Sequence, residues 1–256
     1  MNINNKIAVI TGAGSGLGEA CTIFLAAKNA KIALLDYDLS KAENVAKKLN
    51  TKNVLALQCD VSKAESAENA INQIKTQLGT PSILINCAGV ATPTKIISKD
   101  GPLPLQFFEN VINVNLVGTF NMMRLCTHLM SQEKPDDNGE TGIIINTSSI
   151  AAFEGQMGQA AYAASKGGVA SLTLPAAREL ARFGIRVMAI APGLFGTPML
   201  LSMPDIVQES LKSTLLFPKR FGLPEEFAQL VGAIIENPML NGEVIRLDGG
   251  LRMQAK

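Results

Sequence analysis

The sequence predicts an α/β protein built on one doubly wound parallel sheet of seven strands, with helices on both faces. Short apolar runs alternate with longer segments of helical spacing along all 256 residues, which is the pattern of a parallel sheet joined by right-handed crossovers. A glycine-rich turn follows the first apolar run directly, and no linker, repeat or shift in composition divides the chain. We therefore expect a single domain over residues 1–256.

The predicted strands are short apolar runs of the kind that is buried on both faces of a parallel sheet. Their length and their flanking turn residues separate them from helices. In chain order they cover residues 6–11, 31–36, 53–59, 82–86, 142–148, 186–191 and 243–247.

The predicted helices lie between these strands. Two segments, 105–130 and 158–183, are long enough for helices of several turns. A shorter helix is predicted over 224–237, where Pro224 suits the first helical position. The run Ser62-Lys63-Ala64-Glu65 has the capping-box pattern and predicts the start of a helix that runs toward Leu78.

Two segments interrupt the alternation, residues 90–104 after the fourth strand and residues 192–222 after the sixth. Ligands of a doubly wound sheet bind beyond the carboxyl ends of its strands, and long loops there are often functional. We therefore expect a substrate loop or lid over about 193–222. Its apolar side chains fit either a lid over an apolar substrate or additional core: Leu194, Phe195, Met199, Leu200, Leu201, Met203, Leu215, Leu216 and Phe217.

Composition argues against several classes of function. The net charge is +1, so no global field favours nucleic acid or an anionic membrane as a partner. The first residues lack the pattern of a signal or transit peptide, and no apolar run is long enough to span a bilayer. The four scattered cysteines predict free thiols, and we expect a cytoplasmic protein. With His128 as the single histidine we expect no metal site and no hydrolase triad.

The glycine-rich turn predicts a dinucleotide site. Gly12, Gly16 and Gly18 follow the first strand with the spacing G-x-x-x-G-x-G, which differs from the common G-x-G-x-x-G fingerprint. A turn without Cβ atoms lets backbone N–H groups and a helix N-terminus approach a pyrophosphate. Ser15 and Leu17, in the same turn, complete the predicted phosphate-binding set. The structural alternative is a flexible turn without a ligand.

Asp36 predicts which dinucleotide binds. It ends the second strand, where a carboxylate would accept hydrogen bonds from ribose hydroxyls and repel a 2′-phosphate. No Lys or Arg occupies its immediate neighbourhood in the sequence, so we expect NAD rather than NADP. A turn-forming role for Asp36 is the structural alternative. Further cofactor contacts are predicted where the third and fourth strands end, at Asp60, Val61, Asn86, Ala88 and Gly89.

Tyr162 and Lys166 are the candidate catalytic pair. Because they are four residues apart in the segment 158–183, they would project from the same face of a helix. A phenol has a reference pKa near ~10, and a nearby cation lowers it toward the range where it can exchange a proton with an alcohol or a carbonyl. Most pairs at this spacing are solvated helix faces, so the surrounding motifs give this pair its meaning.

Together these residues resemble the short-chain dehydrogenase/reductase family, and the match covers essentially the whole chain. The resemblance implies a Rossmann fold and a catalytic tetrad, carried here onto Asn115, Ser149, Tyr162 and Lys166. Cys87 departs from the family pattern, which often has a second Asn at this position. The matching pieces occur in the order of the family: 11–18, Asp60, 86–89, 113–115, Ser149, Tyr162, Lys166 and 192–193.

The resemblance also implies a role for each of these residues. Ser149 would hold the substrate oxygen, and Tyr162, as phenolate, would take the hydroxyl proton. Lys166 would lower the phenol pKa and bind the nicotinamide ribose, while Asn115 would hold a water that links Lys166 to solvent. The nicotinamide site would be completed by Pro192, Gly193 and Thr197.

Longer runs resemble one subgroup of the family more closely, over residues 151–156, 190–198, 234–238 and 241–249. This subgroup implies NAD, short-chain or branched 3-hydroxyacyl-CoA substrates and a homotetramer. Three alternatives stay open: a 3-oxoacyl-carrier-protein reductase that uses NADPH, a hydroxysteroid dehydrogenase, and a non-enzymatic dinucleotide-binding scaffold. Asp36 argues against the first, and the presence of all four tetrad residues argues against the last.

Overall fold

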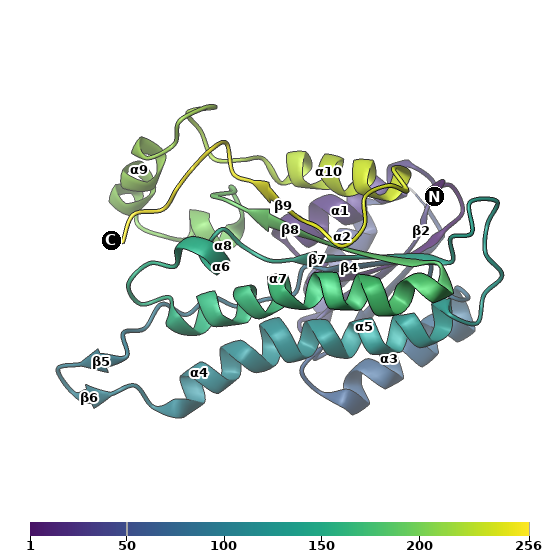
Figure 1. The fold of residues 1–256 in the computed structure, drawn as a ribbon, viewed down its shortest axis with the longest axis horizontal. Coiled ribbons are helices and arrows are strands. Elements are labelled where there is room, and N and C mark those ends of the chain that lie inside the picture. Colours follow the sequence, from purple (N-terminus) through teal and green to yellow (C-terminus); the bar gives the residue numbers. More distant parts are fainter. Residues whose placement is uncertain (50, 256) are drawn as a thin grey trace.

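A computed structural model describes residues 1–49 and 51–255, and its centre is one seven-stranded parallel sheet (Figure 1). The strand order is β3-β2-β1-β4-β7-β8-β9, and every neighbouring pair is parallel. The predicted α/β fold with a doubly wound sheet is therefore confirmed. The strands are β1 Ile7–Thr11, β2 Lys31–Asp36, β3 Val54–Gln58, β4 Ile83–Asn86, β7 Gly142–Thr147, β8 Ile185–Pro192 and β9 Val244–Leu247.

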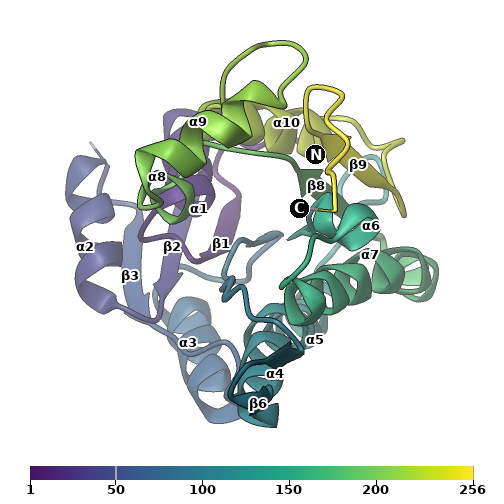
Figure 2. The ribbon, with the colours of Figure 1, turned by 90° about the vertical axis from the view of Figure 1, so that its left-hand side faces the viewer.

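Helices cover both faces of this sheet, as the two views show (Figures 1 and 2). One face carries α1 Gly16–Ala27, α2 Leu39–Lys48 and α10 Pro224–Glu236. The other carries α3 Ala64–Gln77, α5 Gly118–Met130 and α7 Ala160–Leu180. The order in which successive strands join the sheet reverses between β1 and β4, which is where a doubly wound sheet opens to a ligand.

Alternation within the strands explains the two cores. In β1, Ala8 and Ile10 pack into the core under α1 and α10, whereas Ile7 and Val9 pack into the core under α3, α5 and α7. Successive strand side chains point to opposite faces, so a strand buried on both faces must be apolar throughout. This is why apolar runs located the strands to within two residues at each end.

The segment 105–130 forms one long helical stretch with an interruption. It consists of α4 Leu105–Ile112, a π-helical turn at Asn113–Val117 and α5, so the predicted helix is confirmed but for this turn. π-helical turns occur mostly as single turns within α-helices and are frequent at functional sites. The turn contains Asn115.

The capping-box prediction at Ser62 is wrong. Helix α3 begins at Ala64, with Lys63 at the N-cap position and no side-chain capping bond. The Ser62 hydroxyl instead donates to the Asp60 carboxylate at 2.6 Å, because the chain is still turning away from β3 at this point. The predicted helix is therefore present, but Ser62 does not cap it.

Short elements fill the two long loops. Residues 90–104 contain a two-stranded antiparallel hairpin, β5 Ile97–Ser98 and β6 Gly101–Pro102. Helix α6 Ala151–Glu154 follows β7, and α8 Pro198–Leu201 and α9 Asp205–Ser213 follow β8. In the predicted lid, Phe195, Leu200 and Leu215 are buried, whereas Met199, Leu201, Met203, Leu216 and Phe217 are exposed. Some apolar side chains of the loop are therefore buried in the protein, and the others are exposed to solvent.

All four cysteines are free thiols, as predicted. Within the described residues, no helix combines the length and apolar character that crossing a bilayer requires.

Candidate active site

Tyr162 and Lys166 lie one turn apart on α7, at the edge of the sheet where the strands end. The Lys166 ammonium is 5.8 Å from the centroid of the Tyr162 ring. Lys166 is only 4% exposed, and its Nζ donates a hydrogen bond of 2.6 Å to the carbonyl oxygen of Thr147, at the end of β7. Burial lowers the pKa of Lys166 to about 8, because a charged ammonium is poorly solvated there.

The Tyr162 phenol is protonated more firmly than its pairing with Lys166 suggested. Burial raises the pKa of Tyr162, and the nearby Ser149 hydroxyl offsets part of this increase. The Lys166 ammonium faces the Tyr162 ring and the Thr147 carbonyl. The pKa of Tyr162 in the free protein therefore moves in the direction opposite to the one expected from Lys166.

The two serines after β7 have different partners. The Ser148 hydroxyl donates to the backbone carbonyl of Lys166 at 2.9 Å and is fully buried. The Ser149 hydroxyl accepts the N–H of Ala151 at 3.1 Å at the start of α6, and it lies next to Tyr162. Ser148 thus anchors α7, which leaves Ser149 as the serine that faces the phenol.

Asn115 is completely buried and its side chain is held by the protein. Its Oδ1 accepts the N–H of Val90 at 2.8 Å, and its Nδ2 donates to the Val90 carbonyl and to the Ser165 hydroxyl, each at 3.0 Å. Gly89 is packed so closely that a Cβ there would lie 3.2 Å from the Asn115 amide and 3.5 Å from the Lys166 ammonium. Asn115 therefore fixes the loop after β4 beside Lys166, and the predicted water relay stays a prediction.

The glycine-rich turn is built by backbone contact. Gly12 has a φ of +62°, and a Cβ there would lie 2.8 Å from the backbone nitrogen of Ala88. A Cβ at Gly18 would overlap the carbonyl oxygen of Gly12, so α1 can approach β1 only because both positions lack side chains. Ser15 occupies the N-cap position of α1, and Leu17 packs half-buried against the core. The turn thus presents the N-terminus of α1 beyond β1, as an anion site requires.

Asp36 is tied to this turn in a way that the sequence did not reveal. One carboxylate oxygen accepts the N–H of Gly14 at 2.9 Å, and the other accepts the N–H of Asp38 at 3.0 Å. The structure also corrects the expectation of no basic neighbour: Lys41 packs against Gly14, with its ammonium 4.0 Å from the Asp38 carboxylate. A lysine side chain therefore packs beside the turn that Asp36 holds.

The remaining predicted cofactor residues lie at the ends of two strands, Asp60 and Val61 after β3 and Asn86 at the end of β4. Asp60 is half-buried, and one of its carboxylate oxygens accepts the N–H and the hydroxyl of Ser62. Val61 is buried against Gly118. The Asn86 side chain points into the core, where its amide donates to Asn146 at 2.9 Å. Asn86 thus joins β4 to β7, while the backbone of the following residues reaches the site.

The loop after β8 brings the last predicted residues to the turn. The Pro192 carbonyl accepts the N–H of Ile150, and the Gly193 N–H donates to the Leu247 carbonyl at 2.9 Å. Thr197 is the N-cap residue of α8, and its side chain lies 3.3 Å from where a Cβ of Gly16 would be. The predicted lid segment therefore begins in contact with the phosphate-binding turn.

Several polar residues that organise the site were not predicted as site residues from the sequence. Thr11 accepts the N–H of Ala88 at 3.1 Å with its hydroxyl, and Asn146 and Ser165 hold Asn86 and Asn115. A polar residue at the end of an otherwise apolar strand is the available signal for Thr11 and Asn146. Ser165 carries no such signal, because its contact joins α7 to a distant turn. His128, by contrast, is exposed on α5, as expected of a surface residue.

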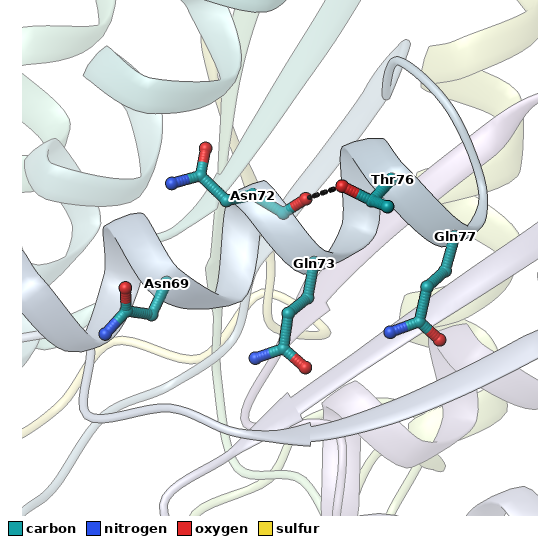
Figure 3. A pocket seen from close by; sticks show the side chains of 5 residues that line it. All are labelled: Asn69, Asn72, Gln73, Thr76 and Gln77. Atoms are coloured by element: carbon teal, nitrogen blue, oxygen red, sulfur yellow. Dashed lines mark hydrogen bonds between the residues drawn. The ribbon is translucent and has the colours of Figure 1, made fainter.

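A polar hollow of about 400 Å³ lies elsewhere, on the exposed side of α3 (Figure 3). Its lining side chains are amides and a hydroxyl, and the Thr76 hydroxyl donates to the Asn72 carbonyl of the same helix. Since α3 runs antiparallel to the strands, these residues lie toward the amino ends of the strands, away from Tyr162. This hollow contains no group that could perform the chemistry.

A phenol, a buried ammonium and a serine hydroxyl beside a turn open to a pyrophosphate are the groups that a nicotinamide-dependent dehydrogenase requires. The family model of the short chain dehydrogenases matches residues 6–205. The chain therefore belongs to the short-chain dehydrogenase/reductase family and is an oxidoreductase that uses a nicotinamide cofactor.

Individual relatives are similar over nearly their whole length. The chain is 51% identical over 255 residues to 3-hydroxyacyl-CoA dehydrogenase type-2 of Homo sapiens, which covers 99% of this chain and 97% of that protein. The enzyme of the same name from Drosophila melanogaster is 47% identical over 253 residues, covering 98% and 99%. The crystal structure of 3-hydroxyacyl-CoA dehydrogenase type-2 from Mycobacterium avium matches with a TM-score of 0.93 at 35% identity, covering 100% of this chain and 98% of that one.

Proposed function

We propose that this chain interconverts 3-hydroxyacyl-CoA and 3-oxoacyl-CoA with short or branched acyl chains, using NAD. The observation that carries the substrate class is the identity of about half of all positions, over 99% of the chain, with relatives named 3-hydroxyacyl-CoA dehydrogenase type-2. The aligned residues include the loops beyond the strand ends, where substrates of doubly wound sheets bind.

The residues present fit a dinucleotide. Because Gly12 and Gly18 lack side chains, the turn packs against the Ala88 backbone and α1 lies close to β1, which places the N-terminus of α1 where a pyrophosphate would bind. Gly89 leaves room beside Lys166 for a ribose. Thr197 and Gly193 are the proposed contacts of the carboxamide. When bound, the nicotinamide accepts a hydride from the substrate in one direction and supplies it in the other.

NAD rather than NADP is proposed on the basis of Asp36. Its carboxylate ends β2 and is fixed by two backbone N–H groups, so a 2′-phosphate placed there would meet a negative charge that cannot turn away. Lys41 is the competing feature, but its ammonium lies nearer to Asp38 than to the end of β2. The carboxylate at Asp36 therefore decides the preference.

The proposed chemistry assigns one task to each side chain. The Ser149 hydroxyl holds the substrate oxygen next to the Tyr162 phenol, which takes the hydroxyl proton during oxidation and returns it during reduction. Lys166 binds the ribose and places a positive charge near the phenol. Asn115 acts by positioning the loop after β4 beside Lys166.

A homotetramer is proposed as the assembly. Large apolar side chains remain exposed along α4, the π-helical turn and α5, at Leu105, Phe107, Val117 and Phe120. Apolar groups in such number along one helix are typical of a surface covered by another subunit. The cytoplasmic location stays a prediction from the sequence.

The test compares cofactors and acyl carriers in parallel. Reduction of acetoacetyl-CoA is followed with NADH and with NADPH, beside the same acyl group on an acyl carrier protein. We expect kcat/KM with NADH to exceed that with NADPH by about tenfold or more, since a single charge repulsion of 1.4 kcal/mol is a factor of ten.

Two variants sharpen this comparison. Asp36→Asn keeps an acceptor for the Gly14 N–H and removes the charge, so it should move the preference toward NADPH. Glu43→Gln, at an exposed position of α2, should leave it unchanged. A wild-type preference for NADPH would contradict the role of Asp36, and a preference for the carrier protein would contradict the substrate class.

A further inference from the structure

A third apolar cluster lies apart from the two cores of the sheet. Its buried members are Ile150, Leu200, Leu215, Phe221 and Leu251, and Leu194 and Met253 pack against it. All of them come from segments that follow β7, β8 and β9, at the edge of the sheet where Ser149 and Gly193 lie. Ile150 directly follows Ser149, and Leu194 directly follows Gly193.

The last residues of the chain close this cluster from outside. Residues 249–255 run back over α6 after β9, and Leu251 is only 3% exposed. The tail is fixed to α6 and the turn after it: the Met253 N–H donates to Glu154 at 2.9 Å, and the Met157 N–H donates to the Ala255 carbonyl at 3.0 Å. The side chain of Leu251 is a buried member of the cluster.

The tail also contacts the predicted lid. Gly249 has a φ of +60°, and a Cβ there would lie 2.8 Å from the Phe217 carbonyl oxygen. A Cβ at Gly250 would lie 3.7 Å from the Leu216 side chain. The tail is thus held between α6, which follows Ser149, and the loop that follows β8.

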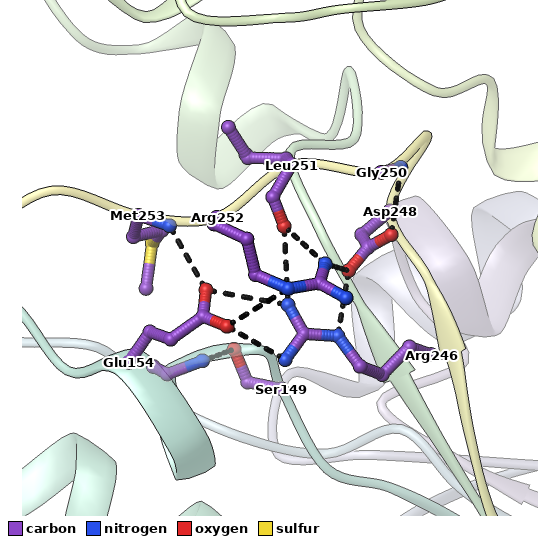
Figure 4. A network of polar contacts seen from close by, with 9 residues as sticks. Ser149, Glu154, Arg246, Asp248, Gly250, Leu251, Arg252 and Met253 are labelled. Carbon is purple, nitrogen blue, oxygen red and sulfur yellow. Dashed lines mark hydrogen bonds and ion pairs between the residues drawn. The ribbon is translucent and has the colours of Figure 1, made fainter.

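Two arginines and two carboxylates hold this arrangement (Figure 4). Arg246, on β9, donates to Glu154 at 2.9 Å, to Asp248 at 2.7 Å and to the Leu251 carbonyl at 3.1 Å. Arg252 pairs with the same two carboxylates and donates to the Leu251 carbonyl at 2.8 Å. The hydrogen bond from Arg246 lowers the pKa of Glu154, so the pair is ionic at neutral pH.

We infer that residues 249–255 form the outer wall of the substrate pocket, that Leu251 sets the size of the apolar group admitted, and that Glu154 is the positioning residue that holds this wall. The proposal rests on the proposed function for its apolar substrate. An apolar chain bound beside Ser149 and Tyr162 meets the side chains that Ile150, Leu194 and Leu251 gather. Shortening Leu251 lengthens the space available, and enlarging it shortens that space.

The test measures chain-length selectivity with NADH and 3-oxoacyl-CoA substrates of four and eight carbons. Leu251→Ala should raise the ratio of kcat/KM for eight carbons over four carbons by about tenfold, and Leu251→Phe should lower it by a similar factor, in line with what a methylene or two contributes in an apolar pocket. A general loss of folding lowers kcat/KM for both substrates and leaves their ratio unchanged. A ratio that rises in Leu251→Ala and falls in Leu251→Phe therefore shows that Leu251 lines the pocket.

Glu154→Gln tests the positioning role. It keeps an acceptor for the Met253 N–H but removes the ion pair with Arg246, so the ratio should rise less than in Leu251→Ala, through KM rather than kcat. Met239→Ala, at a side chain 87% exposed after α10, serves as the control and should leave the ratio unchanged.

A ratio within about twofold of the wild type in both Leu251 variants would overturn the proposal. If the wild type reduces neither 3-oxoacyl-CoA, the proposed function has failed instead. The same variants are then compared on aliphatic ketones of increasing length. An unchanged preference for chain length would overturn the proposal that residues 249–255 line the pocket, and a shifted preference would support it.

Discussion

Lys166 shows how burial and charge compete at a single residue. Its ammonium has lost nearly all contact with solvent and keeps one short hydrogen bond to the Thr147 carbonyl. Burial moves its pKa from 10.5 to about 8, so at neutral pH the folded protein carries a buried charge at a cost in stability. A group that function requires, and that weakens the fold, is expected at an active site.

The pH dependence of stability follows from this shift. Between pH 8 and 10.5 the unfolded chain holds the Lys166 proton more tightly than the folded protein, so the free energy of unfolding should rise with pH in this window, by up to roughly 3 kcal/mol. Lys166→Met lacks this contribution. Urea unfolding of the wild type and Lys166→Met at pH 7.5 and pH 9.5 measures the contribution of Lys166 to the free energy of unfolding. Tyr162 and the cysteines are present in both proteins.

We expect the stability of the wild type relative to Lys166→Met to be greater at pH 9.5 than at pH 7.5. An equal difference at both values would mean that Lys166 is solvated in the folded protein, contrary to its burial.

At the scale of elements, contacts between distant segments determine the local structure that sequence periodicity does not predict. The strands and long helices were predictable, because burial on both faces imposes apolar runs and helical spacing. The π-helical turn was not, since Asn115 adopts it while bonded to Val90 and Ser165, which are distant in the sequence. Within the predicted lid, Pro198 and Pro204 stand at the starts of α8 and α9, which periodicity did not predict.

The packing of α1 on β1 is the element-scale contact that the cofactor site depends on most. Gly18→Ala places a Cβ against the Gly12 carbonyl oxygen, which the backbone of the turn cannot avoid. We expect loss of NADH binding in a fluorescence titration and a loss of stability of about 1–3 kcal/mol, as is usual for overpacking.

Gly167→Ala is the matched control. Gly167 lies inside α7, and the nearest atom to its added Cβ is 3.9 Å away. This variant should keep NADH binding and gain up to about 1 kcal/mol from helix propensity. Equal behaviour of the two variants would contradict the close approach of α1 to the turn.

At the scale of the whole molecule, the site is assembled from segments far apart in the chain. The glycine turn was predicted from its place after the first strand, and Tyr162 and Lys166 from their spacing, whereas Asn115 and Ser149 followed from the family resemblance. Lys41 near the ribose pocket and the tail over α6 were not, since only the folded chain brings them there. The sequence therefore indicated candidate catalytic and cofactor-binding residues, but not the segments that the fold packs around them.

The assembly is tested at its exposed apolar helix. Val117 and Phe120 are 43% and 58% exposed and lie three residues apart, so they share one side of the helical stretch. Phe120→Glu places a charge where another subunit is proposed to pack, and light scattering should show a lower molecular mass than for the wild type. Phe120→Leu should keep the wild-type mass, and an unchanged mass in both variants would place the subunit contact elsewhere.

The most direct test of the account is the turnover of Tyr162→Phe, which lacks only the phenol oxygen. With acetoacetyl-CoA and NADH we expect kcat to fall by about 10²–10⁴-fold while the Kd for NADH stays within about twofold, because the phenol moves the proton and the ring keeps its place. Tyr37→Phe, at the other tyrosine, which is 72% exposed, should retain wild-type turnover. Turnover of Tyr162→Phe close to that of the wild type would contradict the account, since no proton would then pass through Tyr162.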